Sequence, residues 1–265
     1  MTVSNPHDHF FRATFARPEV AAEFARHYLP PPVVAHLDLT TLQPVTASYV
    51  DEELRDHVTD LLYQVRLQDG DLAYVYLLFE HKSYPDRWVA FQLLRYMVRI
   101  WDHARQQEPS ADLPPILPLV LYHGEQRWRI AARFHDLVAA PPAFTDYVPD
   151  FQYALYDLST YSDAELVGAV SVQVPLWTMK HIYDTDWETA LVQLMALLQA
   201  LAQAESGLAF VETVLRYVGS FGFCRATPSV ALKTARNRVF VGITDLFRVV
   251  TRLWVGIGRL HPANS

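Results

Sequence analysis

Residues 61–82 read LLYQVRLQDGDLAYVYLLFEHK, two apolar runs separated by the short polar segment Gln68–Asp71. An Asp-Gly pair between two such runs is a strong hairpin signal, so we expect strands over 58–67 and 72–82. The second run is apolar at consecutive positions from Ala73 to Phe79, which is typical of a central strand covered on both faces.

A helical region is expected before this hairpin. Apolar residues recur with helical spacing over 10–28, and Pro18 is placed to divide this segment in two. Asn5 or Asp8 could cap the first turn. The prolines at 30–32 then end the helical region.

A helix and two strands are expected after the hairpin. Residues 87–106 contain neither Gly nor Pro, and their apolar residues form one stripe along a helix. This stripe consists of Val89, Leu93, Met97 and Ile100. Ile116–Tyr122 then predicts a buried strand, and Phe151–Leu158 predicts a last short strand.

The composition becomes helical beyond about residue 160. A helix start is indicated by the run Ser162-Asp163-Ala164-Glu165. Helices are expected over 176–183, 187–204, 208–219 and 239–260. The predicted fold class is therefore α/β, with a central mixed sheet flanked by helices and a mainly helical C-terminal part. We expect one domain over 1–204, with its core at about 5–160, and a helical tail over 205–265 whose role the sequence does not indicate.

Composition limits the class of protein. Of the 265 residues, 51% are apolar and 19% are charged, which is typical of a folded chain. The net charge of −7 excludes a basic coat over the whole surface but not a local basic patch. The single cysteine excludes an intrachain disulfide framework. The N-terminus carries no apolar signal segment, and charges interrupt the apolar stretch 239–257, so we expect a cytoplasmic protein with no membrane partner.

Three charged residues near the ends of the hairpin strands carry the candidate chemistry: Asp60, Glu80 and Lys82. Residues two apart on a strand point to the same face, so Glu80 and Lys82 project together, and the hairpin can bring Asp60 beside Glu80. Neighbouring carboxylates repel each other unless a cation lies between them, and Mg²⁺ is commonly held by carboxylates, water and substrate phosphate. The group predicts a site for phosphodiester hydrolysis, in which Lys82 positions or deprotonates the water or stabilises the developing charge.

Plainer interpretations stay open at this point. Glu-x-Lys is a common pattern, and the three residues could be solvated charges at strand ends. Two features favour a site: the charges interrupt apolar runs, and a helix with polar groups follows at once. A metal-dependent hydrolase of small phosphate esters is a further alternative. A zinc site is not expected, because none of the eleven histidines has the spacing of a structural zinc site and no Cys pair supports them.

The predicted helix after the hairpin has a positively charged side. Gln92, Arg95 and Arg99 are spaced at i, i+3 and i+7 and share one face. The charged residues of segment 82–105 give a local charge of +3 and are Lys82, Arg87, Arg95, Arg99 and Arg105 with Asp86 and Asp102. A positive groove beside an acidic metal site suits a polyanion such as DNA. The alternative is a solvated helix face on which Arg99 pairs with Asp102.

Several sequence blocks together point to a known family. The main runs are Thr59–Tyr63, Tyr76–Ser83 and Phe91–Met97, and the further blocks are Pro6–Arg12, Val50–Arg55 and Pro118–Gly124. In order and spacing, these blocks resemble the recombination-promoting nuclease family, whose members are also described as transposase-like and belong to the PD-(D/E)xK nuclease superfamily. The resemblance covers roughly residues 5–160 and says little about 205–265.

The resemblance implies a restriction-endonuclease-like fold and a Mg²⁺-dependent DNA endonuclease linked to recombination and mobile elements in bacteria, with Mn²⁺ or Ca²⁺ as substitutes. The metal ligands that it implies are Asp60, Glu80 and the His81 carbonyl. The catalytic residues that it implies are Asp60, Glu80, Lys82 and Gln92, with Asp8 as an additional acid from the first helix. The candidate DNA-binding residues are Arg87, Arg95 and Arg99. Many superfamily members have lost activity, so the alternative is a catalytically silent DNA- or protein-interaction subunit, and a homo-oligomer stays open.

Overall fold

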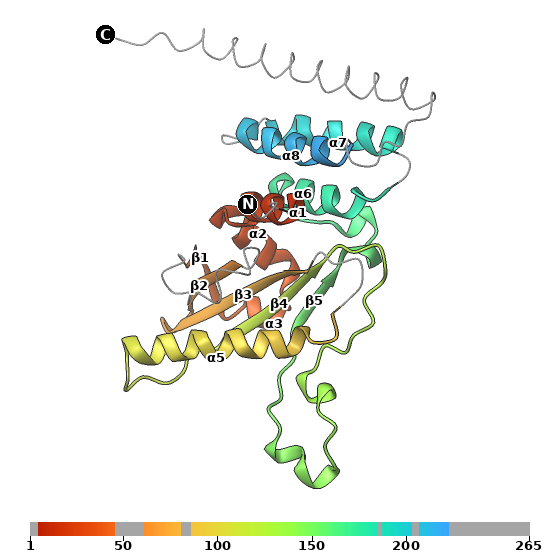
Figure 1. The fold of residues 1–265 in the computed structure, drawn as a ribbon. Coiled ribbons are helices and arrows are strands. Elements are labelled where there is room, and N and C mark those ends of the chain that lie inside the picture. The colour runs from red at the N-terminus through yellow and green to blue at the C-terminus, as the bar shows by residue number, and fades with distance from the viewer. Residues whose placement is uncertain (1–4, 46–60, 81–85, 185–186, 203–206, 223–265) are drawn as a thin grey trace, which may run out of the picture. The chain divides into compact units, whose positions relative to one another are not determined.

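The computed structural model describes residues 5–45, 61–80, 86–184, 187–202 and 207–222 (Figure 1). The α-helices of this part are α1 (Pro6–Phe15), α2 (Pro18–Tyr28), α3 (Pro31–Val34), α5 (Val89–Gln107), α6 (Val170–His181), α7 (Trp187–Ala202) and α8 (Gly207–Gly222). Short 3-10 helices are η2 (Phe134–Leu137), η3 (Pro142–Tyr147), η4 (Leu158–Thr160) and η5 (Asp163–Glu165). The expected helix over 239–260 lies outside the described residues.

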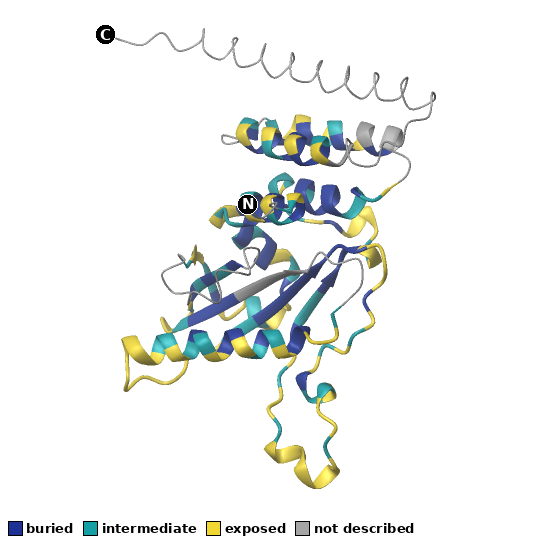
Figure 2. Cartoon of the chain, in the orientation of Figure 1, coloured by how far each residue is buried: buried dark blue, intermediate teal, exposed yellow. Residues whose placement is uncertain are grey.

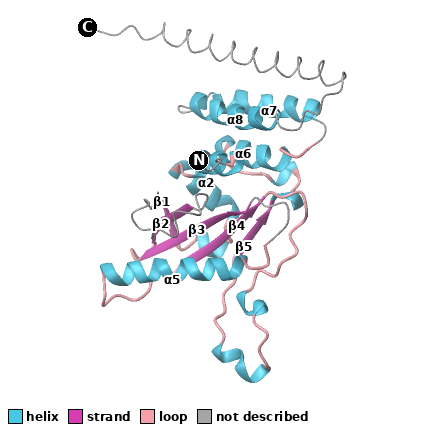
Figure 3. Ribbon diagram, in the orientation of Figure 1, coloured by secondary structure: helices cyan, strands magenta, loops and turns pink. Residues whose placement is uncertain are grey.

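Five strands form one mixed sheet in the order β1-β2-β3-β4-β5 (Figure 3). They are β1 (Leu37–Pro44), β2 (Leu61–Leu67), β3 (Leu72–Glu80), β4 (Ile116–Tyr122) and β5 (Ala154–Asp157). Neighbouring strands from β1 to β3 are antiparallel, whereas β4 pairs parallel with β3 and β5 pairs parallel with β4. The predicted α/β fold, a mixed sheet flanked by helices with a helical C-terminal region, is confirmed.

The hairpin predicted at Asp69-Gly70 joins β2 to β3. Their register runs from the pair Arg66↔Leu72 to the pair Leu61↔Leu77. Gly70 has a φ of +98°, a backbone conformation that residues with a Cβ atom rarely adopt. The Arg66 guanidinium donates a hydrogen bond to the Gly70 carbonyl over 2.8 Å. The local sequence therefore fixes the register of the two strands that lead to Asp60 and Glu80.

Helix α5 covers one face of the sheet (Figure 1). The apolar stripe predicted for this helix is buried: Val89, Leu93, Met97 and Ile100 are each at most 9% exposed. Three of these residues belong to a core cluster that also contains Tyr74 of β3 and Val120 and Tyr122 of β4. Burial of this stripe positions the opposite side of α5 toward solvent (Figure 2).

Helices α1, α2 and α6 lie over the other face of the sheet (Figure 1). Asn5 caps α1, because its Oδ1 accepts a hydrogen bond from the His7 amide over 3.1 Å. The Tyr63 hydroxyl of β2 donates to the Phe15 carbonyl at the end of α1, and the Tyr156 hydroxyl of β5 donates to the Tyr28 carbonyl at the end of α2. Both helices are thus tied to the sheet at their C-terminal ends.

A long segment between β4 and β5 extends away from the sheet (Figure 1). At its base, the Arg133 side chain donates to both carboxylate oxygens of Asp150, and the rings of Phe134 and Phe151 stack with centroids 5.5 Å apart. At its tip, the Tyr147 side chain is 83% exposed. We call residues 138–149 the arm.

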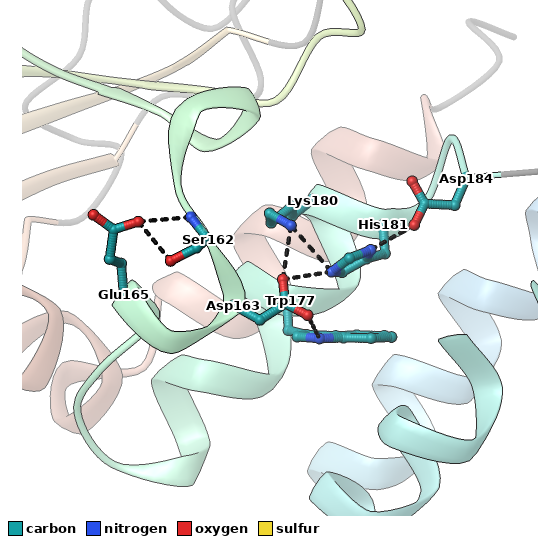
Figure 4. Close-up of polar contacts among 7 residues, drawn as sticks. All are labelled: Ser162, Asp163, Glu165, Trp177, Lys180, His181 and Asp184. Carbon is teal, nitrogen blue, oxygen red and sulfur yellow. Dashed lines mark hydrogen bonds and ion pairs between the residues drawn. The ribbon is translucent and has the colours of Figure 1, made fainter. Parts of the chain in front are cut away.

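A polar network fixes the C-terminal half of α6 to the short turn η5 that precedes the helix (Figure 4). The Asp163 carboxylate accepts hydrogen bonds from Trp177 Nε1 over 3.1 Å and from Lys180 Nζ over 2.7 Å. His181 lies between two carboxylates, with Nε2 2.9 Å from Asp163 Oδ1 and Nδ1 2.5 Å from Asp184 Oδ2. The predicted helix start at Ser162 is a capping box that closes the single turn η5.

The chain forms two compact units, Met1–Leu198 and Gln199–Ser265. The first contains the whole sheet and helices α1, α2, α3, α5 and α6. In the second, α8 has a buried apolar side that includes Phe210, Val214 and Tyr217. Among the described helices, none combines the length and apolar character needed to cross a bilayer.

Candidate nuclease site at the carboxyl ends of the central strands

Of the predicted metal ligands and Lys82, only Glu80 belongs to a described strand. Glu80 is the last residue of β3, and its backbone pairs in register with Tyr122 of β4. Asp60, His81 and Lys82 lie outside the described residues. Leu61, the first residue of β2, pairs with Leu77 of β3, so the start of β2 and the end of β3 lie at the same end of the hairpin. Within the described residues, the candidate group is therefore represented at this end of the hairpin by Glu80 alone.

Three parallel strands end together at this edge of the sheet. Glu80 of β3 pairs with Tyr122 of β4, and Tyr122 pairs with Asp157 of β5. The carboxyl ends of parallel strands are the usual place for a binding site in an open α/β sheet, because the connecting segments leave a crevice there. The row Glu80–Tyr122–Asp157 thus defines the edge around which the other candidate residues can be placed.

Asp157 is a structural carboxylate in this row. Its side chain is buried, Oδ2 accepts a hydrogen bond from the Trp128 amide over 2.8 Å, and Oδ1 accepts from the Ser159 amide and hydroxyl over 3.0 and 2.7 Å. These donors compensate the cost of burying the charge. We therefore assign Asp157 to holding the strand ends together.

Helix α1 brings a second group of polar side chains to the same edge. His7 of α1 and His123, which follows β4, are both buried, and their ring centroids are 4.7 Å apart. Tyr183, after α6, stacks on His123 with an angle of 16° between the planes, and its hydroxyl lies 3.2 Å from His7 Nε2. These residues come from three distant parts of the chain and meet beside the end of β4.

Asp8 follows His7 on α1 and is half-buried. Burial raises the pKa of its carboxyl from 3.8 to about 6. A carboxyl that has lost part of its hydration becomes ionised more readily when a cation is bound next to it. This environment is compatible with the role of additional acid that the sequence suggested for Asp8.

The polar residues predicted on α5 do share one side of the helix. Gln92 and Arg99 are half-buried and Arg95 is exposed, so this row follows the border between the core-facing and the solvent-facing sides. Asp102 pairs with Arg105, with 3.4 Å between Nη2 and Oδ1. The alternative pairing of Asp102 with Arg99 is not among the ion pairs of the described residues.

The donor set can be judged by its chemistry. Carboxylate oxygens of Asp60 and Glu80 and a backbone carbonyl of His81 are hard ligands of the kind that Mg²⁺ prefers. Within 5–45, 61–80, 86–184, 187–202 and 207–222, no group of three His, Cys, Asp or Glu side chains is arranged to hold a metal ion. The residues that fit Mg²⁺ are thus those at and just beyond the ends of β2 and β3.

Residues 5–209 match the model of a family described as "Putative transposase, YhgA-like". The chain belongs to this YhgA-like transposase family. The match includes the whole sheet and the three helices that cover it opposite α5. The YhgA-like family assignment therefore applies to the edge at which Glu80, His7 and His123 lie.

Several relatives of this YhgA-like protein have names that describe them as nucleases or as nuclease-like. It is 31% identical to "Recombination-promoting nuclease RpnD" of Escherichia coli O157:H7 over 74% of this chain and 75% of that protein. It is 29% identical to "Recombination-promoting nuclease RpnC" of Escherichia coli strain K12 over 74% of this chain and 64% of that protein. It is also 31% identical to the "Inactive recombination-promoting nuclease-like protein RpnE" of that strain, over 70% of this chain and 61% of that protein. No solved structure matches this YhgA-like chain significantly.

Sequence reasoning did not place His7, His123 and Tyr183 in the YhgA-like site. The spacing of the histidines fits no zinc site, and spacing along the chain does not show that two of them meet. A usable signal was present in the blocks Pro6–Arg12 and Pro118–Gly124, because each block contains one of the two histidines that meet. Tyr183 had no comparable signal.

Proposed function

We propose that this YhgA-like protein is a metal-dependent DNA endonuclease that hydrolyses phosphodiester bonds at the sheet edge formed by the start of β2 and the carboxyl ends of β3 and β4. The observation that carries the proposal is the position of Glu80 at the end of the central strand, in register with Tyr122 of the parallel neighbour. The names of the relatives RpnD and RpnC support nuclease chemistry. The proposal extends that chemistry to this chain.

Each candidate residue has a distinct task in this proposal. The carboxylates of Asp60 and Glu80, with the His81 carbonyl, would hold Mg²⁺, which when bound lowers the pKa of a water ligand and stabilises charge on the scissile phosphate. As a neutral amine, Lys82 accepts the proton of the attacking water; as an ammonium, it orients that water and compensates negative charge as the phosphate reacts. The Gln92 amide steadies the water or the DNA backbone from α5.

Arginines supply the contacts to the DNA backbone. Arg87 precedes α5 and Arg95 is exposed on it, so both guanidiniums can reach a polyanion from solvent. Arg99 lies one turn further along, half-buried on the same side as Gln92. Because the whole chain carries a net charge of −7, we propose that this local group of cations, and not overall charge, directs DNA to the site.

A plasmid cleavage assay with Mg²⁺ tests the proposal. We expect Asp60→Ala and Lys82→Ala to lower the cleavage rate by about a hundredfold or more, the usual range for loss of an acid-base or electrostatic group. Asp146→Ala, on the exposed arm, is the matched control for an aspartate and should cut as the parent protein does. Equal cleavage by Asp60→Ala and the parent would contradict the assignment.

A silent DNA- or protein-interaction subunit is the second candidate, and it is favoured by the relatives whose names contain "inactive". Calorimetry with Mg²⁺ and Mn²⁺ separates the two. A metal site in the parent that is lost in Asp60→Ala and in Glu80→Ala supports the nuclease. Absence of any metal site, together with absence of cleavage, supports the silent subunit.

A further inference from the structure

Two aromatic side chains at the N-terminal end of α5 are exposed. Trp88 is 53% exposed and Phe91 is 48% exposed, although large aromatic residues normally bury most of their surface. The Asp86 carboxylate accepts a hydrogen bond from the Trp88 amide over 2.9 Å and so fixes the backbone at this point. The exposure therefore belongs to an ordered turn at the entry to the helix.

These rings share one side of α5 with two arginines. Trp88, Phe91 and Arg95 are spaced at i, i+3 and i+7 and lie on the side of α5 opposite to the buried stripe. The ring centroids of Trp88 and Phe91 are 6.5 Å apart with an angle of 75° between the planes. The Arg87 guanidinium carbon lies 4.7 Å from the centre of the Trp88 ring. We call these four residues the aromatic surface.

We propose that the aromatic surface binds unpaired bases, so that the substrate is single-stranded DNA or a duplex with unpaired nucleotides. This inference rests on the proposed function. Proteins that hold single strands combine aromatic rings, on which bases stack, with cations that contact the backbone. Bases in an intact duplex are already stacked on each other and present only their edges, so exposed rings gain nothing from them.

Charge and position favour DNA over a protein partner for this surface. The Arg87 guanidinium lies against the Trp88 ring, and Arg95 is on the same side of α5, while Asp102, further along the exposed side, pairs with Arg105. The Asp86 carboxylate next to the rings accepts the hydrogen bond of the Trp88 amide. Trp88 stands at the start of α5, the helix that also carries Gln92 and Arg99 of the proposed site, so a strand whose bases lie on the rings can extend along the same helix. A purely apolar contact with a protein would not need this arrangement.

Binding measurements in EDTA test the inference without any cleavage. The probes are a fluorescent oligothymidylate and an abasic oligonucleotide of the same length, followed by anisotropy. We expect the parent to prefer the base-bearing probe by about tenfold or more, and Trp88→Ala/Phe91→Ala to lose this preference. Arg95→Ala should weaken binding of both probes alike and reduce the salt dependence, because it contacts phosphate.

Matched controls separate stacking from general loss of aromatic surface. Tyr147→Ala and Phe144→Ala remove exposed rings from the arm and should keep the preference of the parent. A parent that binds both probes equally, or a double variant that keeps the preference, would overturn the inference. The inference is equally overturned by a concentration-dependent dimer that Trp88→Ala/Phe91→Ala dissociates while the base preference is absent, because the surface would then bind a second copy.

Failure of the inference and failure of the proposed function are distinguishable. Plasmid cleavage with Mg²⁺ that depends on Lys82, combined with no base preference in EDTA, retains the nuclease and rejects the aromatic surface. A base preference that depends on Trp88 and Phe91, without cleavage, retains the surface and rejects catalysis.

Discussion

The rings of His7 and His123 lie 4.7 Å apart, although the two residues are separated by most of the sheet in sequence. His7 is in the first turn of α1, and His123 directly follows β4. Their contact joins the N-terminal helix to the edge at which Glu80 ends the central strand. Stability and site geometry are therefore coupled at this point.

Replacement of His123 tests this coupling. We expect His123→Ala to lower the free energy of unfolding by about 2 kcal/mol, because it leaves a cavity beside two rings. Chemical denaturation measures this loss. His36→Ala, at an exposed position, should change the stability by less than about 0.5 kcal/mol. A His123→Ala protein as stable as the parent would show that the contact is not part of the packed structure.

Asp8→Asn should make the protein more stable at neutral pH. Because burial raises the pKa of this carboxyl to about 6, the folded state binds a proton more tightly than the unfolded state, and stability falls as pH rises from about 4 to 6. Removing the charge eliminates this loss, with a gain of about 1 kcal/mol after allowance for partial exposure. The melting temperatures of Asp8→Asn and of the parent, measured at about pH 4 and at about pH 7, give the size of this gain on either side of the titration range. A gain that is the same at both pH values would contradict the assignment.

Asp157→Ala should be strongly destabilising. The substitution leaves the buried amide of Trp128 without its acceptor and releases the turn at Ser159, so we expect a loss of about 2–3 kcal/mol. Asp157→Asn should lose nearly as much, since an amide nitrogen cannot accept the second hydrogen bond. Asp112→Ala, in an exposed loop, is the control for urea denaturation. If Asp157→Asn matches the parent, the carboxylate does not have this structural role.

The Asp163 network predicts a loss of stability in acid. Burial by itself raises the pKa of the Asp163 carboxyl, but hydrogen bonds from Lys180 and His181 outweigh it, and the pKa lies below 3.8. A depressed pKa contributes stability above that ordinary value, and this contribution disappears as the carboxyl is protonated at lower pH. Asp163→Ala should therefore lower the free energy of unfolding by about 1 kcal/mol at about pH 7. The loss should be smaller below about pH 4, where carboxyl groups become protonated.

The pH dependence of the Asp163→Ala deficit is measured by thermal unfolding across that range. Glu212→Ala removes an exposed ion pair with Arg216 and is the control, for which we expect an effect below about 0.5 kcal/mol. A deficit for Asp163→Ala that grows as the pH falls would contradict the sign of the shift.

Much of the fold could be predicted from local chemistry. The turn around Gly70 and the apolar stripe of α5 depend on residues close in sequence, and both have the predicted structure. Strand β1 was not predicted. Its residues are partly polar, and its register with β2 shifts between Asp38 and Gln43, so neither alternation nor a regular ladder marks it. Strand β5 is shorter than the expected 151–158 because only Ala154–Asp157 pairs with β4.

The candidate site was predictable only in part, for a physical reason. The strand ends at Glu80 follow from a hairpin, which is a local structure. The meeting of His7, His123 and Tyr183 depends on how α1 and the segment after α6 pack on the sheet, and no short-range pattern encodes that. Asp60, His81 and Lys82 lie outside the described residues, so their roles stay predictions.

The arm offers a position for engineering. Its two ends are held together by the Arg133–Asp150 ion pair and by the stacked rings of Phe134 and Phe151, while its tip at Phe144 and Tyr147 is exposed. A peptide inserted at such a tip changes neither the core nor the strand pairing. We expect an affinity tag or a fluorescent label placed there to report on the folded protein while leaving the sheet edge at Glu80 accessible.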